Sequence, residues 1–167
     1  MKKAILLGTD HLTQLGNNQK VSYPFYIEEL CKTNNIKAIA EEIHTQSIAA
    51  DISAKLNIEY IIIEPNLEER EKLGIEDRTE IDYEFEFKHK VSIDDLPSKE
   101  YEAYNRRIQN VYRERELEWF KRISKLDTWP LLIICGSNHC QPFFNLLSKE
   151  GIDIVKDSSK LAVCQNT

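Results

Sequence analysis

Two histidines in this sequence of 167 residues occur in the same local pattern. AILLGTDH covers residues 4–11 and LIICGSNH covers residues 132–139, and each is an apolar run that ends in Gly-x-x-His. An imidazole can act as a general base or bind a metal near neutral pH. At the ends of parallel strands, His11 and His139 would stand at the sheet edge where ligands bind in α/β proteins. The repeated spacing favours a shared site, although either one could be a loop histidine with a local hydrogen bond.

A pair of glutamates ends another segment, AIAEEIH at residues 38–44. Successive strand residues point to opposite faces, so Glu41 and Glu42 cannot both lie on one side of a sheet. One of them would share the carboxyl edge with the histidines. Two imidazoles and a carboxylate can hold a divalent metal with open positions for water, and the ligands would then be His11, Glu42 and His139. Without a metal, the same groups supply a general base and an orienting acid.

A fourth element lies in a long amphipathic segment at residues 97–127, which predicts a helix. With Trp119 at the centre of its apolar stripe, Arg115 falls inside the stripe and Glu116 lies at its margin. A buried arginine is costly unless it is paired, so Arg115 could clamp an anionic group or a developing oxyanion, or orient Glu116. The alternative is an arginine whose stem packs while its head pairs with a structural acid.

The elements that must position these residues alternate along the chain. Apolar runs predict strands, and segments of helical periodicity follow them; the strands are at 3–8, 36–43, 59–65, 130–136 and 152–157, and the helices are at 22–35, 47–57 and 142–151. Strands that alternate with helices are typical of parallel sheets. We therefore predict an α/β fold, with a mainly parallel sheet of about five strands flanked by helices.

A charge-dense stretch at residues 66–100 interrupts this alternation. A helix is predicted at 66–74. At 82–93, apolar and charged residues alternate, which predicts a half-exposed strand, and a partner-facing segment or a homodimer interface would show the same pattern. We expect a single α/β domain over residues 1–167, with 66–100 as a charged insertion before the long helix.

The composition narrows the class of protein. Lys and Arg total 22 against 28 Asp and Glu, and this acidic balance disfavours a nucleic-acid binder. The short apolar run near the N-terminus lacks a signal-peptide cleavage site, and no segment is long enough to cross a bilayer, so we expect a cytoplasmic protein without a membrane partner. The four cysteines show no zinc spacing, which indicates structural thiols. Cys140 is the exception to this structural interpretation, because it directly follows the candidate site residue His139.

The motifs, taken in order, resemble the superfamily of erythromycin esterases, ChaN-like proteins and TraB/Tiki proteins. They read GTDH at 8–11, EE at 41–42, RELEW at 115–119 and GSNH at 136–139. The resemblance implies ester hydrolysis with a histidine base or metal-dependent peptide cleavage in some members, and haem binding in others. Trp119 stands where the family has methionine.

We therefore predict a small hydrolase-like protein that acts on an ester or a peptide-like substrate. Its catalytic residues would be His11, Glu41, Glu42, Arg115, Glu116 and His139. The histidines and a glutamate would either bind a divalent metal as the cofactor or activate water directly. A second interpretation is a non-catalytic module that holds a metal, haem or a small anion in the same pocket and contacts a partner through residues 66–100. A third is a structural subunit, for which both histidines would be dispensable.

Overall fold

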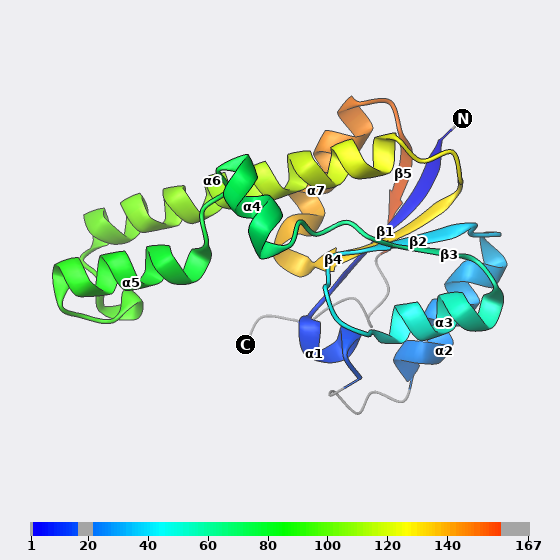
Figure 1. The fold of residues 1–167 in the computed structure, drawn as a ribbon, viewed down its shortest axis with the longest axis horizontal. Helices are drawn as coiled ribbons and strands as arrows, with labels where there is room; N and C mark the ends of the chain where they lie inside the picture. The colour runs from blue at the N-terminus through cyan, green and yellow to red at the C-terminus, as the bar shows by residue number, and fades with distance from the viewer. Residues whose placement is uncertain (1, 17–21, 158–167) are drawn as a thin grey trace. The chain divides into compact units, whose positions relative to one another are not determined.

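Five strands form one parallel sheet in the computed structural model, which describes residues 2–16 and 22–157. The strands are β1 (Lys3–Thr9), β2 (Ala38–Glu41), β3 (Glu59–Ile62), β4 (Leu131–Gly136) and β5 (Asp153–Lys156). Their order across the sheet is β3-β2-β4-β1-β5, and every neighbouring pair is parallel. The predicted α/β fold with a parallel sheet of five strands is confirmed (Figure 1).

Helices cover both faces of this sheet. Helices α2 (Ser22–Thr33) and α3 (Ile48–Leu56) lie on one side, and α7 (Ser137–Lys149) packs on the other side (Figure 1). The side chains between the sheet and α2 and α3 form an apolar core that includes Leu7, Ile27, Ile39 and Ile134. None of the helices within the described ranges is long and apolar enough to cross a membrane.

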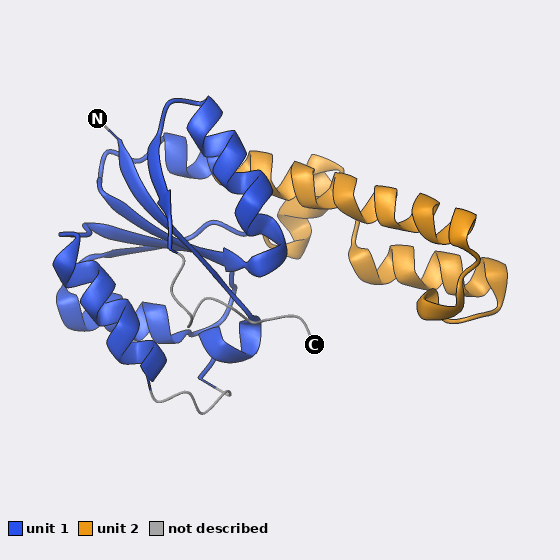
Figure 2. Cartoon of the chain, turned by 180° about the vertical axis from the view of Figure 1, so that it is seen from behind, with its two compact units in different colours: residues 1–64, 120–167 blue, residues 65–119 orange. Residues whose placement is uncertain are grey.

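The chain divides into two compact units, which Figure 2 shows in different colours. The first unit, residues 1–64 and 120–167, contains the sheet. The second unit, residues 65–119, contains α4 (Leu67–Leu73), α5 (Arg78–His89), the 3-10 turn η1 (Ile93–Asp95) and most of α6 (Ser98–Ser124). The second unit extends beyond the predicted insertion at 66–100, because it also includes most of the long helix.

The predicted strand at residues 82–93 is wrong, because α5 covers most of that segment. Ile81 is only 1% exposed and packs with Phe85 and the apolar residues of α6 in the core of the second unit. Tyr83 and Phe87 are exposed on the other side of the helix. Ile81 and Phe85 are four residues apart and therefore share one face of a helix. The charged residues between the aromatic ones also give an alternation of period two, which is why the sequence predicts a strand.

One helix begins earlier than the sequence predicts, and one short helix is not predicted at all; each of them carries a histidine. Helix α7 begins at Ser137 rather than at Pro142, so His139 lies in the first turn of a helix. Proline is favoured at the first helical position, but here it lies inside the helix and gives up one backbone hydrogen bond. The short helix α1 (His11–Gln14) begins directly after β1, where the Asp10 side chain accepts a hydrogen bond from the backbone N–H of the third helical residue.

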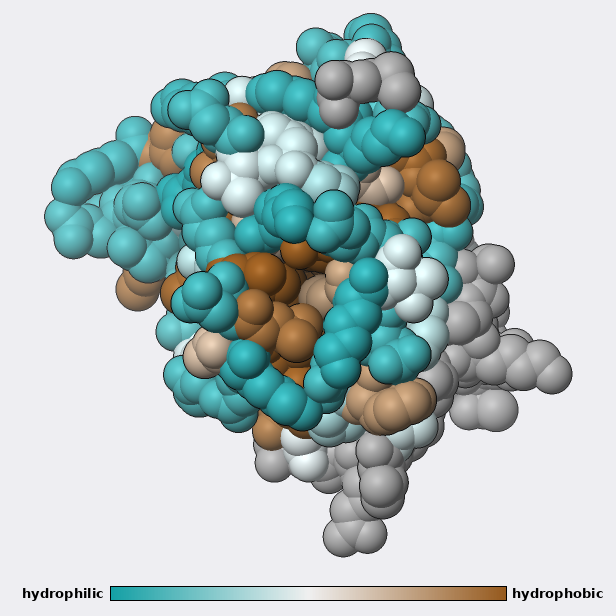
Figure 3. Space-filling model, turned by 90° about the vertical axis from the view of Figure 1, so that its right-hand side faces the viewer, coloured by the Kyte–Doolittle hydropathy of each residue, from teal (hydrophilic) through white to brown (hydrophobic). Residues whose placement is uncertain are grey.

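A pocket of about 270 Å³ opens at the amino-terminal edge of the sheet. Figure 3, which faces this edge, shows a hollow with a hydrophobic floor and a hydrophilic rim. The lining residues are Lys3, Ala4, Ile5, Asn34, Ile36, Pro130, Asp153 and Val155. They stand at or near the beginnings of the strands, so this pocket lies at the edge opposite the predicted site residues.

Candidate functional site

The order of the strands brings the predicted site residues to one edge of the sheet. Strand β4 lies between β2 and β1. Thr9, the last residue of β1, is in register with Gly136, the last residue of β4. The segments that carry His11 and His139 therefore leave from neighbouring strands, and β2 ends at Glu41 on the other side of β4. The sequence alone leaves this adjacency open, because it does not fix the strand order.

Glu41 and Glu42 are both buried, and they contact different elements. Glu41 accepts hydrogen bonds from side chains of α1 and β3 and from the residue that caps α3. Glu42 instead faces the end of β4 and the start of α7. This division agrees with the alternation of side chains along a strand. The carboxyl edge therefore holds two clusters, which we call the Glu41 group (Glu41, Gln14, Ser47 and Tyr60) and the Glu42 group (Glu42, Gly136 and His139).

The Glu42 group places a carboxylate against an imidazole. Oε2 of Glu42 accepts a hydrogen bond of 2.7 Å from the backbone N–H of Gly136. Oε1 of Glu42 lies 3.7 Å from Nε2 of His139, and the two side chains are only 3% and 4% exposed. A backbone group thus fixes the carboxylate, and the carboxylate faces the ring. A fixed carboxylate that faces an imidazole in this way can orient the ring.

The Glu41 group surrounds a carboxylate with three donors. Glu41 accepts hydrogen bonds from Gln14 Nε2 at 3.1 Å, from Ser47 Oγ at 2.5 Å and from Tyr60 OH at 2.7 Å. Burial raises the pKa of Glu41 above its usual value, and the three donors and the charge of His11 act in the opposite direction without cancelling it. The Glu41 carboxyl therefore retains its proton to a higher pH than an exposed glutamate does.

A buried oxygen without a hydrogen-bond partner lies within the Glu41 group. Within the described residues, Gln14 Oε1 has no partner. The buried hydroxyls of Thr9 and Tyr23 lie within hydrogen-bonding reach of each other, and burial, followed by the charge of Glu41, raises the pKa of the Tyr23 hydroxyl. A buried polar atom that lacks a partner costs about 1–3 kcal/mol, so native proteins usually complete such atoms with water or a ligand.

His11 lies at the same edge, but its side chain is exposed. Its charge acts on Glu41, so His11 belongs with the Glu41 group, whereas His139 belongs with Glu42. Across residues 2–16 and 22–157, no three His, Cys, Asp or Glu side chains form a group that could hold a metal ion. Metal binding by His11, Glu42 and His139 therefore stays a prediction.

Arg115 and Glu116 belong to the second unit, and their burial is the reverse of the predicted one. Glu116 is buried and forms an ion pair with Arg113, while Arg115 is half-buried and places its guanidinium carbon 5.3 Å from the centre of the Trp119 ring. The buried stripe of α6 includes Tyr112 and Trp119, and Glu116 lies four residues after the first and three before the second. Glu116 is therefore at the centre of the stripe, and Arg115 is at its margin.

Sequence reasoning missed the residues that donate to Glu41. Ser47 does have a local signal, because it precedes α3 and its Oγ accepts a hydrogen bond from the backbone N–H of Ala50 as an N-cap. The same hydroxyl donates to Glu41. Gln14 and Tyr60 have no such signal, because they come from a short helix and a strand that only the fold brings to Glu41.

Two thiols lie beside the Glu42 group. Sγ of Cys140 is 4.0 Å from Sγ of Cys135, and this contact lowers the pKa of Cys140 while burial opposes it. Gly8 is required for this arrangement, since a Cβ at Gly8 would lie 2.3 Å from Cys140 Sγ. The structure thus brings together two cysteines that are separated in the sequence by the Gly-Ser-Asn-His motif.

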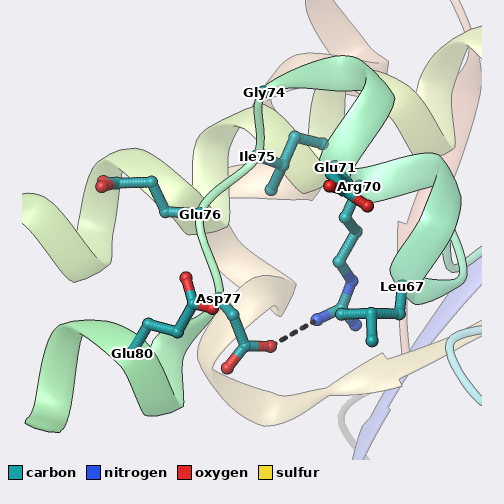
Figure 4. A pocket seen from close by; sticks show the side chains of 8 residues that line it. All are labelled: Leu67, Arg70, Glu71, Gly74, Ile75, Glu76, Asp77 and Glu80. Carbon is teal, nitrogen blue, oxygen red and sulfur yellow. Dashed lines mark ion pairs between the residues drawn. The ribbon is translucent and has the colours of Figure 1, made fainter.

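The second unit has a pocket of its own, of about 390 Å³ (Figure 4). Its lining is mostly charged and consists of Leu67, Arg70, Glu71, Gly74, Ile75, Glu76, Asp77 and Glu80. Arg70 points toward Asp77, with Nη1 3.8 Å from Oδ2 (Figure 4). Asp77 also caps α5, and Glu76 accepts hydrogen bonds from Arg107 of α6. These acidic side chains therefore connect and cap helices.

The comparisons with known proteins add no relative to this picture. The chain matches no protein-family model, no curated protein and no solved structure. The resemblance drawn from the motifs therefore stays a prediction.

Proposed function

We propose that this protein is a hydrolase in which His139, oriented by Glu42, activates a water molecule at the carboxyl edge of the sheet. The observation that carries the proposal is the 3.7 Å approach of Glu42 Oε1 to His139 Nε2 between two buried side chains. The ordered set of motifs supports an ester or a peptide-like molecule as the substrate. Both substrates have a carbonyl carbon that water can attack once a base removes its proton.

In this reaction, His139 takes a proton from water as the oxygen attacks the carbonyl carbon. The imidazolium that forms is stabilised by the Glu42 carboxylate, and it then returns the proton to the leaving group. Gly136 holds the carboxylate in place through its backbone N–H. Because the pair is buried, the attraction between carboxylate and imidazolium is stronger than it would be in water.

The start of α7 supports the same assignment. His139 is the third residue of this helix. The first N–H groups of a helix carry partial positive charge and favour an anion nearby. An oxyanion that forms close to His139 would be stabilised by these groups, as the tetrahedral intermediate of acyl transfer requires.

A second candidate function is the binding of a small polar ligand without turnover. The observation that favours it is the buried oxygen Oε1 of Gln14, which has no hydrogen-bond partner among the described residues although Nε2 of the same side chain donates to Glu41. A ligand with a hydrogen-bond donor would complete it. The Glu41 group would then be the binding site. His11, which is exposed at the same edge, would contact the ligand from the solvent side.

Hydrolysis of a panel of p-nitrophenyl esters and chromogenic peptides tests the proposal. We expect turnover by the wild type and a loss of about 100-fold or more in His139→Gln, since a positioned general base contributes about 10²–10⁴-fold. His89→Gln in the second unit is the matched control and should retain the wild-type rate. Equal rates in His139→Gln and the wild type would contradict the proposal, and stoichiometric binding of a panel compound without turnover would favour the second candidate.

A further inference from the structure

Cys135 and Cys140 are placed as a pair by two separate elements. Cys135 is in β4 and Cys140 is in α7, and their sulfur atoms are 4.0 Å apart. A disulfide has a sulfur–sulfur bond of about 2.05 Å, so a shift of about 2 Å joins them. A rotation of the Cys140 side chain or a small movement of the first helical turns can supply that shift.

The sheet leaves room for this pair at one position. Gly8 of β1 is in register with Cys135 on the neighbouring strand. A Cβ on Gly8 would lie 2.3 Å from Cys140 Sγ, so the Cys140 thiol occupies the space that a side chain at residue 8 would fill. The Cys140 thiol thus packs on the sheet over Gly8, the residue that pairs with Cys135.

Exposure differs between the two thiols in the way that a stepwise oxidation needs. Cys135 is fully buried, and Cys140 is half-buried. A small disulfide in solution can therefore reach Cys140 first. Cys31 provides a contrast, because it is buried in the apolar core under α2 and α3 and burial raises its pKa to about 12. A thiol that is buried and protonated in this way is unreactive.

We propose that Cys135 and Cys140 form a redox-active pair that closes to an intrachain disulfide by exchange with a low-molecular-weight disulfide such as oxidised glutathione. In the first step, Cys140 sulfur bonds to one sulfur of glutathione disulfide, the disulfide bond breaks, and one glutathione thiol leaves with the proton of Cys140. In the second step, Cys135 sulfur bonds to Cys140 sulfur and releases the second glutathione thiol with the proton of Cys135. The protein loses two electrons, and the glutathione disulfide gains them.

This closure would act on His139, which lies between the two cysteines in the sequence. The new bond ties the first turns of α7 to β4 and draws them toward the sheet. His139 and its approach to Glu42 lie in the same turns, so oxidation would change the hydrolysis rate. This consequence rests on the proposed function, whereas formation of the disulfide does not.

Peptide mass mapping after equilibration with reduced and oxidised glutathione tests the pair. Residues 126–149 contain both cysteines and no internal Lys or Arg, so trypsin releases them as one peptide. We expect this peptide to lose the mass of two hydrogen atoms in the folded wild type. The same loss is expected in the folded Cys31→Ser and Cys164→Ser variants, each of which lacks one of the other two cysteines. Cys140→Ser should show no such loss.

The same titration in urea supplies the reference, because an unfolded chain also brings nearby cysteines together by chance. We expect the native pair to oxidise at a ratio of oxidised to reduced glutathione about tenfold lower than the unfolded chain, which corresponds to about 30 mV. An equal or higher ratio for the native protein would overturn the proposal. So would glutathione attached to both cysteines without closure. Because the readout is mass, it decides the matter even if no hydrolysis is found.

Discussion

The Glu42 carboxylate lies 3.7 Å from the His139 imidazole, although the two residues come from the first and the last third of the chain. Their approach follows from the pairing of β2 with β4, which places the end of one strand beside the start of the helix that follows the other. The backbone N–H of Gly136, the last residue of β4, completes the contact by holding the second carboxylate oxygen. The fold therefore places a fixed carboxylate against a buried imidazole.

Glu41→Gln should remove a pH-dependent component of stability. Burial raises the pKa of Glu41 above its usual value of 4.5. The folded protein therefore holds this proton more tightly than the unfolded chain, so the contribution is full below 4.5 and is lost as the pH rises through the raised value. The unfolding free energy of the wild type should therefore fall relative to the variant over the range of pH that begins at about 4.5.

Urea denaturation of the two proteins across this range measures the difference, because their other titratable groups are shared and cancel. A wild type that gains stability over the variant as the pH rises would contradict the expectation. It would mean that the hydrogen bonds from Gln14, Ser47 and Tyr60 outweigh burial and favour the ionised form.

Gly8→Ala should destabilise the protein through a contact with one atom. The added Cβ would lie 2.3 Å from Cys140 Sγ, and overpacking of a core costs about 1–3 kcal/mol. Cys140→Ala removes the sulfur and leaves its Cβ at 3.6 Å, an ordinary contact. The double variant should therefore recover most of the loss, which a double-mutant cycle by chemical denaturation measures. Additive losses in the cycle would show that Cys140 is not the group that requires glycine at residue 8.

Ile81→Ala should destabilise the second unit, because Ile81 is 1% exposed and belongs to the core of that unit. Removing a buried isoleucine side chain costs about 2–5 kcal/mol. Phe87→Ala is the control from the same helix, since Phe87 is 73% exposed and its loss should change the unfolding free energy by less than about 0.5 kcal/mol. Hydrogen exchange over residues 78–89 reports both effects. Comparable losses for the two variants would contradict the helical assignment of this segment, because a strand would place Ile81 and Phe87 on the same face.

The sequence predicts the sheet well because buried parallel strands are continuous apolar runs, as in β1 and β4. It fails at residues 82–93, where alternating aromatic and charged residues suit a strand as well as a helix and only packing against α6 decides between them. It also misplaces the start of α7, since Pro142 carries a strong signal for a first helical position that the structure does not use.

The candidate site is predicted in part for a similar reason. His139 and Glu42 follow strands, so their edge can be inferred from the chain, but their contact depends on the strand order. Gln14 and Tyr60 carry no local signal in the sequence. What connects them with the site is a hydrogen bond to Glu41, and this bond forms only in the folded chain. Arg115 and Glu116 exchange places because one step along a helix rotates a side chain by about 100°, so a small error in the centre of the stripe reverses which of them is buried.

A kinetic double-mutant cycle of Glu42→Gln and His139→Gln, on an ester that the wild type hydrolyses, shows whether the two residues act together in catalysis. The effects of residues that act as one catalytic unit are not additive. We therefore expect each single variant to lose about 100-fold or more in kcat/KM, and the double variant to lose no more than the worse single variant. Circular dichroism of all four proteins confirms that each one is folded. Losses that simply multiply, or single variants with wild-type rates, would show that Glu42 and His139 do not work as an oriented base.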